Sequence, residues 1–293
     1  MYSHFKSMLE VCQRENWPLW KTICAEEEEL TGKGEDTIFQ RMERRYEIMA
    51  RSAAVALDTP LPGHTGKPTL ITGIAQTHNT YAGTGSTLCG PMLNRLMARA
   101  LSCSEANASM GRVCAMPTAG SCGIVPSVLL TLEEELEIPH RKILEALIIA
   151  SGVGAVITQN ATVSGAEGGC QAECGAAAAM AAAAAVYLKD GTPEQSITAA
   201  SHALINVMGL VCDPIAGLVQ IPCAQRNASQ AINALLSADL ALAGMSCPIP
   251  ADEVLEAMYR TGRSLPSTLR ETALGGIAGT NTGRAISKQI HGS

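Results

Sequence analysis

Apolar and polar residues alternate along most of this chain with the spacing of amphipathic helices. Residues 3–57 predict helices with charged faces, including the acidic run Glu26–Glu29, which we interpret as a solvated helix face. From residue 91 onward the pattern predicts helices at 91–102, 124–136, 140–157, 171–188, 193–208, 227–243 and 251–261. We therefore expect an all-α, helical bundle-like domain.

Residues 58–90 have a different character, because Pro, Gly and Thr replace the long side chains there. These residues favour turns, so the segment predicts a long loop or a set of short turns. No repeat and no linker interrupts the chain. We expect one domain over 1–293, with N-terminal helices (1–57), the loop-rich segment and a helical core (91–293).

The expected helix at 171–188 is almost pure Ala in its second half. Ala is the best intrinsic helix former, and its small side chain lets neighbouring helix backbones come close. Only 3% of the residues are aromatic, so the core must be filled by aliphatic side chains. This composition argues against a β-sandwich or barrel and predicts an Ala-rich helix deep in a bundle.

Composition and charge exclude several classes of protein. Lys+Arg number 21 against 27 Asp+Glu, giving a net charge of −6, and no dense basic stripe is available to bind a phosphate backbone. We therefore expect no nucleic-acid partner. The N-terminus does not read as a secretory signal, and the apolar stretches are short or interrupted. We expect a cytoplasmic protein that does not bind a membrane.

The chain has 11 cysteines, at positions 12, 24, 89, 103, 114, 122, 170, 174, 212, 223 and 247. An odd number in a long chain does not suggest a disulfide framework. In a reducing compartment such cysteines are buried packing residues, reactive thiols or metal ligands. The local sequence around each one has to distinguish these roles.

Three Gly-rich junctions interrupt the helical pattern, at 116–125, 160–175 and 211–227. Each contains hydroxyl or amide residues and at least one cysteine beside an apolar helix. Glycine turns and helix starts expose backbone N–H groups, which can bind anions or thiolates. We expect the three junctions to converge on one polar centre enclosed by the bundle.

Cys170, Cys212 and Cys223 are the candidate metal ligands, because all three lie at turn residues. Cys170 and Cys223 also open predicted helices, where the helix dipole favours thiolate. The alternative is that they are small residues at tight turns. Cys174 lies four residues after Cys170, where it is either a fourth ligand that closes the site or a packing residue.

Three motifs resemble the α subunit of the bacterial iron–sulfur L-serine dehydratases. They are MPTAGSCGIVP at 116–126, Asn160 with SGAEGGCQAE at 164–173, and CDPIAGLVQIPCAQRN at 212–227. The likeness runs through most of the chain and includes the tail PSTLRETALGG at 266–276. It is less diagnostic in the N-terminal helices and in residues 58–90.

This resemblance implies a carbon–nitrogen lyase that converts L-serine to pyruvate and ammonia without pyridoxal phosphate. It implies a [4Fe-4S] cluster held by Cys170, Cys212 and Cys223, with one iron free of protein thiolate. An open iron acts as a Lewis acid on the β-hydroxyl, which is otherwise a poor leaving group. The resemblance also implies an all-helical α portion.

The substrate carboxylate needs hydrogen-bond donors. We expect them from Thr118, Ala119, Gly120 and Ser121, assisted by Asn160 and Ser164; ordinary turn formation and helix capping is the alternative. Arg226 could balance the charge of the cluster or of the substrate carboxylate, or be a surface or interface cation.

The base that removes the Cα proton is not evident from the sequence. His78 is the local candidate, against the alternative of a solvated loop histidine. The family's Ser-Ser-Ser-His-Thr stretch, which lies in its β portion, is absent here. The resemblance therefore implies an α half that requires a β subunit, which supplies the base.

Two other functions stay open. One is a lyase similar to L-cysteine desulfidase, which removes sulfide by the same kind of elimination. The other is a non-catalytic iron–sulfur or metal-stabilised helical scaffold, with Cys174 as the fourth ligand.

Overall fold

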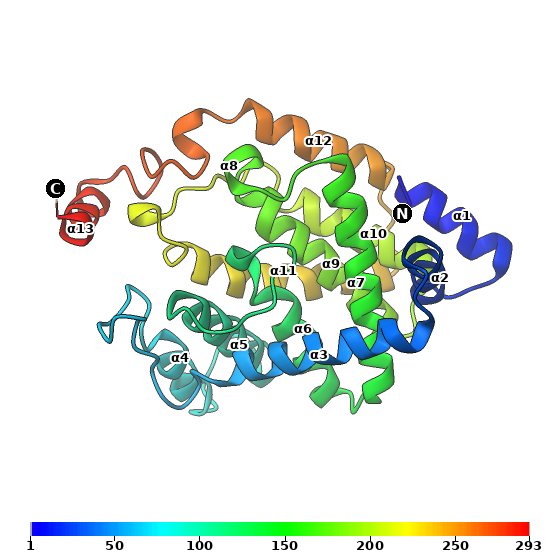
Figure 1. Ribbon diagram of the computed structural model, residues 1–293, viewed down its shortest axis with the longest axis horizontal. Coiled ribbons are helices and arrows are strands. Elements are labelled where there is room, and N and C mark those ends of the chain that lie inside the picture. Colours follow the sequence, from blue (N-terminus) through cyan, green and yellow to red (C-terminus); the bar gives the residue numbers. More distant parts are fainter. Residues whose placement is uncertain (1, 293) are drawn as a thin grey trace.

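The computed structural model describes residues 2–292, and they form an all-α fold, as the sequence predicts (Figure 1). The helices are α1 (Phe5–Glu15), α2 (Leu19–Thr31), α3 (Glu35–Ala54), α4 (Ile74–Ala82), α5 (Gly90–Ala108), α6 (Ile124–Glu135), α7 (His140–Asn160), α8 (Gly165–Gly168), α9 (Ala176–Leu188), α10 (Pro193–Ile205), α11 (Cys223–Leu242), α12 (Ala251–Ser264) and α13 (Asn281–His291). Short helical turns are η1 (Ala119–Ser121), η2 (Gln171–Gly175), η3 (Ile215–Gly217) and η4 (Ser267–Leu269). Across 2–292 the extended pairing is a single isolated bridge, between Cys212 and Arg270.

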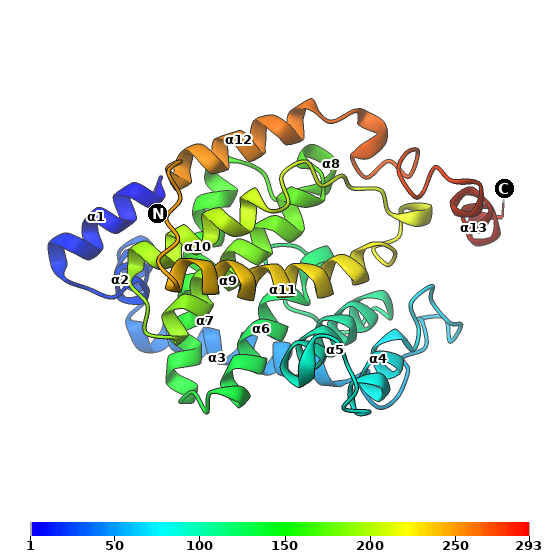
Figure 2. The ribbon, with the colours of Figure 1, turned by 180° about the vertical axis from the view of Figure 1, so that it is seen from behind.

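The Ala-rich helix α9 lies at the centre of the bundle, as its composition predicts. It packs against α6, α7, α10 and α11, which surround it in both views (Figures 1 and 2). Every residue from Ala176 to Val186 is at most 3% exposed. Because Ala adds so little bulk, four neighbouring helices can approach this one closely and still bury it on all sides.

Two helical stretches are long and apolar enough to span a membrane by length and composition, namely His140–Asn160 and Gln171–Leu188. In the fold, 67% and 89% of their apolar windows are buried against other helices. This burial is what core helices of a soluble bundle show, so the two stretches do not indicate a membrane span.

The predicted helices agree with the observed ones except at some ends. The helix expected at 227–243 begins four residues earlier, at Cys223, directly after Pro222. The helix expected at 171–188 is divided, because residues Gln171–Gly175 form a π-helical turn before α9 starts. Such π turns occur often at functional sites.

The loop expected over 58–90 is wrong in its middle, where Ile74–Ala82 form α4. The physical reason is a buried carboxylate from another helix. Glu105 on α5 is 0% exposed and accepts hydrogen bonds from the backbone N–H groups of Leu61 (2.7 Å), Gly73 (2.9 Å) and Ala75 (3.3 Å). It thus stabilises the start of α4 from a position far along the chain, which local sequence does not reveal.

After α12 the chain leaves the bundle and ends in α13, which packs on η3. The N-terminal helices lie at the opposite end of the molecule from α13 (Figures 1 and 2). The segment between α12 and α13 runs past the loops around η3 and α8, so the C-terminal region borders the end of the bundle where the Gly-rich junctions meet.

Candidate functional site

The three Gly-rich junctions meet at the end of the bundle that faces the C-terminal segment (Figure 1). Cys170, Cys212 and Cys223 are 2%, 3% and 8% exposed there. They lie close enough together that the charge of Cys170 raises the pKa of both Cys212 and Cys223, and the charge of Cys223 raises that of Cys212. We call these three residues and the loops that carry them the thiol corner.

Cys170 is positioned by its two neighbours. Gly169 has φ +76°, and a Cβ there would lie 2.7 Å from the carbonyl oxygen of Leu210, so only glycine fits. Gln171 is 0% exposed and its side chain donates to the carbonyl oxygens of Gly168 (2.9 Å) and Met258 (3.1 Å). Its Oε1 atom accepts from the N–H of Gly209 at 2.8 Å. These contacts fix the turn on which Cys170 lies.

Cys212 is held by the C-terminal segment. Its N–H donates to the carbonyl oxygen of Leu269 (2.9 Å), and its own carbonyl accepts from the N–H of Glu271 (2.7 Å). The tail around 266–276 therefore pairs directly with a candidate ligand.

Cys223 is the first residue of α11, and Asn227 ties it to η1. The Asn227 amide nitrogen donates to the carbonyl oxygens of Cys223 (2.8 Å) and Gly120 (2.7 Å). Its Oδ1 atom accepts from the N–H of Gly123 at 2.8 Å. One buried amide side chain thus joins the first and third junctions.

Arg226 points into the thiol corner and is not a surface cation. Its guanidinium pairs with the buried Asp213 carboxylate (2.8 Å) and donates to the carbonyl oxygen of Val211 (2.8 Å). It also lies within hydrogen-bonding range of Cys170. The second oxygen of Asp213 accepts from the N–H of Ile277 at 2.7 Å.

The thiols differ in their electrostatics. Burial raises the pKa of Cys223 to about 12 and that of Cys212 further, and the nearby anionic groups add to both shifts. The pKa of Cys170 is lowered, first by its hydrogen bond with Cys174 and then by the charge of Arg226. Burial is thus the largest influence on the pKa of Cys223, although this residue begins α11.

Cys174 is 1% exposed, and its sulfur lies 3.3 Å from the sulfur of Cys170. The Cys212 sulfur instead faces Glu173 Oε2 at 4.0 Å. Within residues 2–292, no group of three or more His, Cys, Asp or Glu side chains is already arranged to hold a metal ion.

Glu173 is a residue of the thiol corner that the sequence analysis did not single out. It accepts a hydrogen bond from the Thr118 hydroxyl through Oε1 at 3.0 Å. Burial raises its pKa to about 7, although the Thr118 hydrogen bond opposes the shift. The available signal was an isolated acid in the run GGCQAECGAAAA, where every neighbour is small or uncharged.

The predicted substrate-binding residues of the first junction lie in and around η1. Thr118 precedes η1, and its hydroxyl lies 3.2 Å from that of Ser121. Ser121 is buried, Ala119 is exposed, and the carbonyl of Gly120 is taken by Asn227. This turn therefore lies next to Glu173 and the thiols.

The other predicted site residues lie away from the thiol corner or at its edge. Asn160 ends α7, and its amide donates to the carbonyl oxygens of Ser3 and Val156. Ser164 precedes α8 and contributes backbone hydrogen bonds to it. His78 lies on α4, where burial lowers its pKa and Asn94 opposes the shift. Within residues 2–292, neither Asn160 nor His78 has a hydrogen bond to one of the three thiols.

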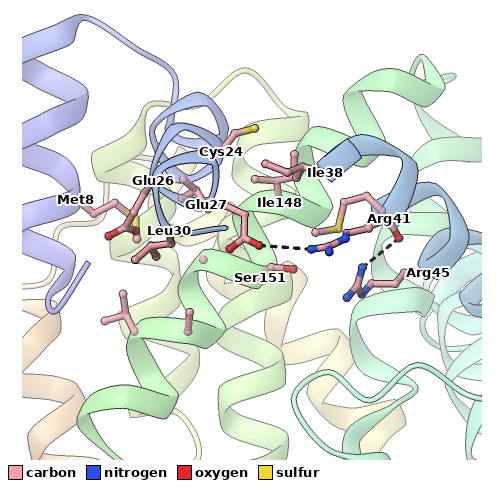
Figure 3. A pocket seen from close by; sticks show the side chains of 15 residues that line it. Met8, Cys24, Glu26, Glu27, Leu30, Ile38, Arg41, Arg45, Ile148 and Ser151 are labelled. Carbon is pink, nitrogen blue, oxygen red and sulfur yellow. Dashed lines mark hydrogen bonds and ion pairs between the residues drawn. The ribbon is translucent and has the colours of Figure 1, made fainter. Parts of the chain in front are cut away.

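A pocket of about 220 Å³ opens elsewhere, between α1, α2, α3 and α7 (Figure 3). Apolar side chains such as Met8 and Ile148 line it, and the Glu27–Arg41 pair (3.8 Å) crosses its rim. None of the predicted site residues lines this pocket. The pocket and the candidate chemistry are therefore in different parts of the molecule.

The chain is similar to known proteins over its whole length. The profile of the family described as "Serine dehydratase alpha chain" matches residues 14–278. The "Probable L-serine dehydratase, alpha chain" of Bacillus subtilis (strain 168) is 42% identical over 100% of this chain and 96% of the relative. The "L-serine dehydratase, alpha chain" of Peptoniphilus asaccharolyticus is 44% identical over 99% and 98%. The "L-serine dehydratase" of Helicobacter pylori (strain ATCC 700392 / 26695) is 34% identical over 95% of this chain but only 62% of the relative, which is longer.

Proposed function

Because the chain belongs to the serine dehydratase alpha chain family, we propose that it is the α subunit of an L-serine dehydratase. This enzyme is a carbon–nitrogen lyase, and L-serine gives pyruvate and ammonia. The observation that carries the proposal is the convergence of three cysteine-bearing junctions on one buried corner, in a chain that aligns end to end with α chains.

Cys170, Cys212 and Cys223 would hold the [4Fe-4S] cluster. Thiolates are the ligands that iron–sulfur clusters take. The surroundings fit a cluster, because the residue next to the Cys212 sulfur is a glycine. A Cβ on this residue, Gly165, would lie 2.8 Å from that sulfur and crowd it. Arg226 beside Cys170 offsets the negative charge that bound thiolates bring.

When bound, such a cluster supplies a Lewis-acidic iron with an open position for the departing hydroxide. The protein residues bind and orient the substrate. Ser121 and the backbone of η1 would offer donors to the substrate carboxylate on one side of the corner, next to the Thr118 hydroxyl, which donates to Glu173. Loss of the Cα proton and of hydroxide leaves an enamine, which becomes an imine and is hydrolysed to pyruvate and ammonia.

The proton acceptor comes from a partner. Within residues 2–292, no histidine side chain has a hydrogen bond to Cys170, Cys212 or Cys223. The relatives are named α chains, and the longer Helicobacter pylori relative has additional sequence. We therefore assign the base to a β subunit that completes the site.

Anaerobic reconstitution with iron and sulfide, with and without the β subunit, tests this function. We expect cluster absorbance in the α chain alone and pyruvate from L-serine only with the β subunit. Cys170→Ser, Cys212→Ser and Cys223→Ser should each lose bound iron. Cys12→Ser is the matched control, since Cys12 is also buried but lies on α1. Full activity of iron-free protein with its partner would refute the proposal.

One observation favours a second arrangement. The Cys174 sulfur is only 3.3 Å from that of Cys170, so a closed site with four thiolates is also within reach. Such a site has no vacant position for the substrate hydroxyl and would be structural or would carry electrons. The Cys174→Ala variant separates the two arrangements.

A further inference from the structure

The thiol corner contains a carboxylate that has no cationic partner. Glu173 forms no ion pair with any Lys, Arg or His in residues 2–292. The nearest cation, Arg226, is engaged by Asp213, and Glu271 adds a second negative charge nearby. A buried carboxylate is costly unless it is paired, so this site is electrostatically incomplete in the chain by itself.

The position of this carboxylate is fixed by its surroundings. A Cβ on Gly165 would lie 2.7 Å from Glu173 Oε2, and one on Gly120 would lie 3.2 Å from Oε1. The backbone thus packs directly against both oxygens, and the Thr118 hydroxyl holds Oε1. A charged group held in one orientation in this way is preorganised for a ligand.

We propose that Glu173 binds the ammonium group of L-serine and so makes the enzyme select an amino acid over the corresponding hydroxy acid. This inference rests on the proposed function. Its ligand class is a small zwitterion whose ammonium provides the missing positive charge.

The placement of Glu173 matches the three polar groups of the substrate. Its Oε1 side faces Thr118 at η1, where the substrate carboxylate is expected, and its Oε2 side faces Cys212, on the cofactor side. A substrate that spans from η1 to the thiols must pass beside this carboxylate. With the carboxylate at η1 and the hydroxyl at the cofactor, the ammonium on Cα is the remaining group, and Glu173 is the buried carboxylate that lies between Thr118 and Cys212 to receive it. Three separate contacts of this kind also distinguish L-serine from its mirror image.

The decisive comparison uses inert ligands that differ only in the ammonium group. L-alanine carries ammonium and carboxylate but no leaving group, whereas propionate carries only the carboxylate. Calorimetry on the reconstituted holoenzyme should show that Glu173→Gln weakens L-alanine binding roughly ten- to a hundredfold. This is the effect expected when a ligand loses a hydrogen bond to a charged group. Propionate should bind the variant as well as, or better than, the wild type.

Kinetics give an independent readout. In Glu173→Gln the KM for L-serine should rise, while the inhibition constant of 3-hydroxypropionate, which lacks the amine, should stay constant or fall. Glu167→Gln is the matched control, because Glu167 is an exposed acid on α8 in the same junction and should leave both values unchanged. Glu173→Asp keeps the charge and should lose less affinity than the Gln variant.

Several results would overturn the inference. An equal loss of L-alanine and propionate binding would mean a general structural role. A fall in kcat with unchanged KM would assign Glu173 to the proton transfer instead. Loss of iron from Glu173→Gln would make it a ligand of the cofactor. If wild-type holoenzyme with its partner makes no pyruvate from L-serine, it is the proposed function that fails, so the two failures are distinguishable.

Discussion

The centre of the bundle and the thiol corner are both buried, yet they are held together by different forces. Around α9 the interior is made of Ala, Val and Leu side chains, and the residues from Ala176 to Val186 are at most 3% exposed. In the thiol corner, individual polar side chains connect the loops, as Asn227 does for η1 and α11. The structure of the centre is therefore stabilised by close packing, whereas that of the thiol corner is stabilised by particular hydrogen bonds and charges.

The two regions therefore tolerate different substitutions. In the centre, a substitution that adds atoms to a side chain finds no space for them, because four helices approach α9 closely. In the corner, a lost polar group leaves its partner buried and unsatisfied, which costs more than the net value of the bond itself.

The largest effect is expected at Asp213. Asp213→Ala leaves the half-buried Arg226 without its counter-ion and the N–H of Ile277 without its acceptor, so we expect a loss of about 3 kcal/mol in the free energy of unfolding. Urea unfolding measures this value. Glu256→Ala is the control, because Glu256 pairs with Arg260 on α12 but its side chain is 56% exposed, and it should cost less than about 0.5 kcal/mol. Similar losses in both variants would contradict the contrast.

Ala182→Leu tests the centre. Ala182 is 0% exposed, so the larger side chain must displace neighbouring helices, and we expect a loss of about 2 kcal/mol with cofactor binding in the corner retained. Ala285→Leu on α13 is the matched control, since Ala285 is exposed and should stay within about 0.5 kcal/mol of the wild type. A loss of iron binding in Ala182→Leu that exceeds its loss of stability would show that the two regions are coupled.

The sequence predicted the centre well because its signal is local. The Ala run at 176–185 determines both the helix and its burial, and the apolar pattern places α6 and α7 within three residues of their observed ends. The start of α4 could not be predicted, because its cap is Glu105, which lies about 30 residues away in sequence. A contact between residues so far apart in sequence does not change the local helix propensity, so the local sequence could not predict it.

The site was predictable only in part for the same reason. Motifs indicated the cysteines and η1, and the structure brings these together. Glu173 looked unremarkable in sequence, because what makes it special is a desolvated position between Thr118 and Cys212. The pairing of Cys212 with residues 269–271 likewise depends on how the C-terminal segment folds back.

Cys174→Ala sharpens the contrast within the corner. If three thiolates hold the cofactor, the variant keeps the iron content of the wild type, and it loses about 1 kcal/mol of stability because a buried sulfur leaves a small void. Iron per chain after anaerobic reconstitution and urea unfolding are the two measurements. Loss of the iron in this variant alone would instead support the closed four-thiolate site.

The smallest effect is expected at His140, outside both regions. Burial alone would lower its pKa, but hydrogen bonds and charges from Glu43 and Glu133 outweigh that and raise it. A folded-state pKa above the unfolded value of about 6.5 means stabilisation that is complete below that pH and is lost as the pH rises through the folded-state pKa. Because the side chain is 43% exposed, we expect only a few tenths of a kcal/mol. His140→Gln should therefore destabilise the protein more at pH 5.5 than at pH 8.5, as urea unfolding at the two values would measure. A larger loss of stability at pH 8.5 would mean that neutral His140 contributes by packing against Tyr46 and not through its charge. In that case this surface site would resemble the centre more than the thiol corner.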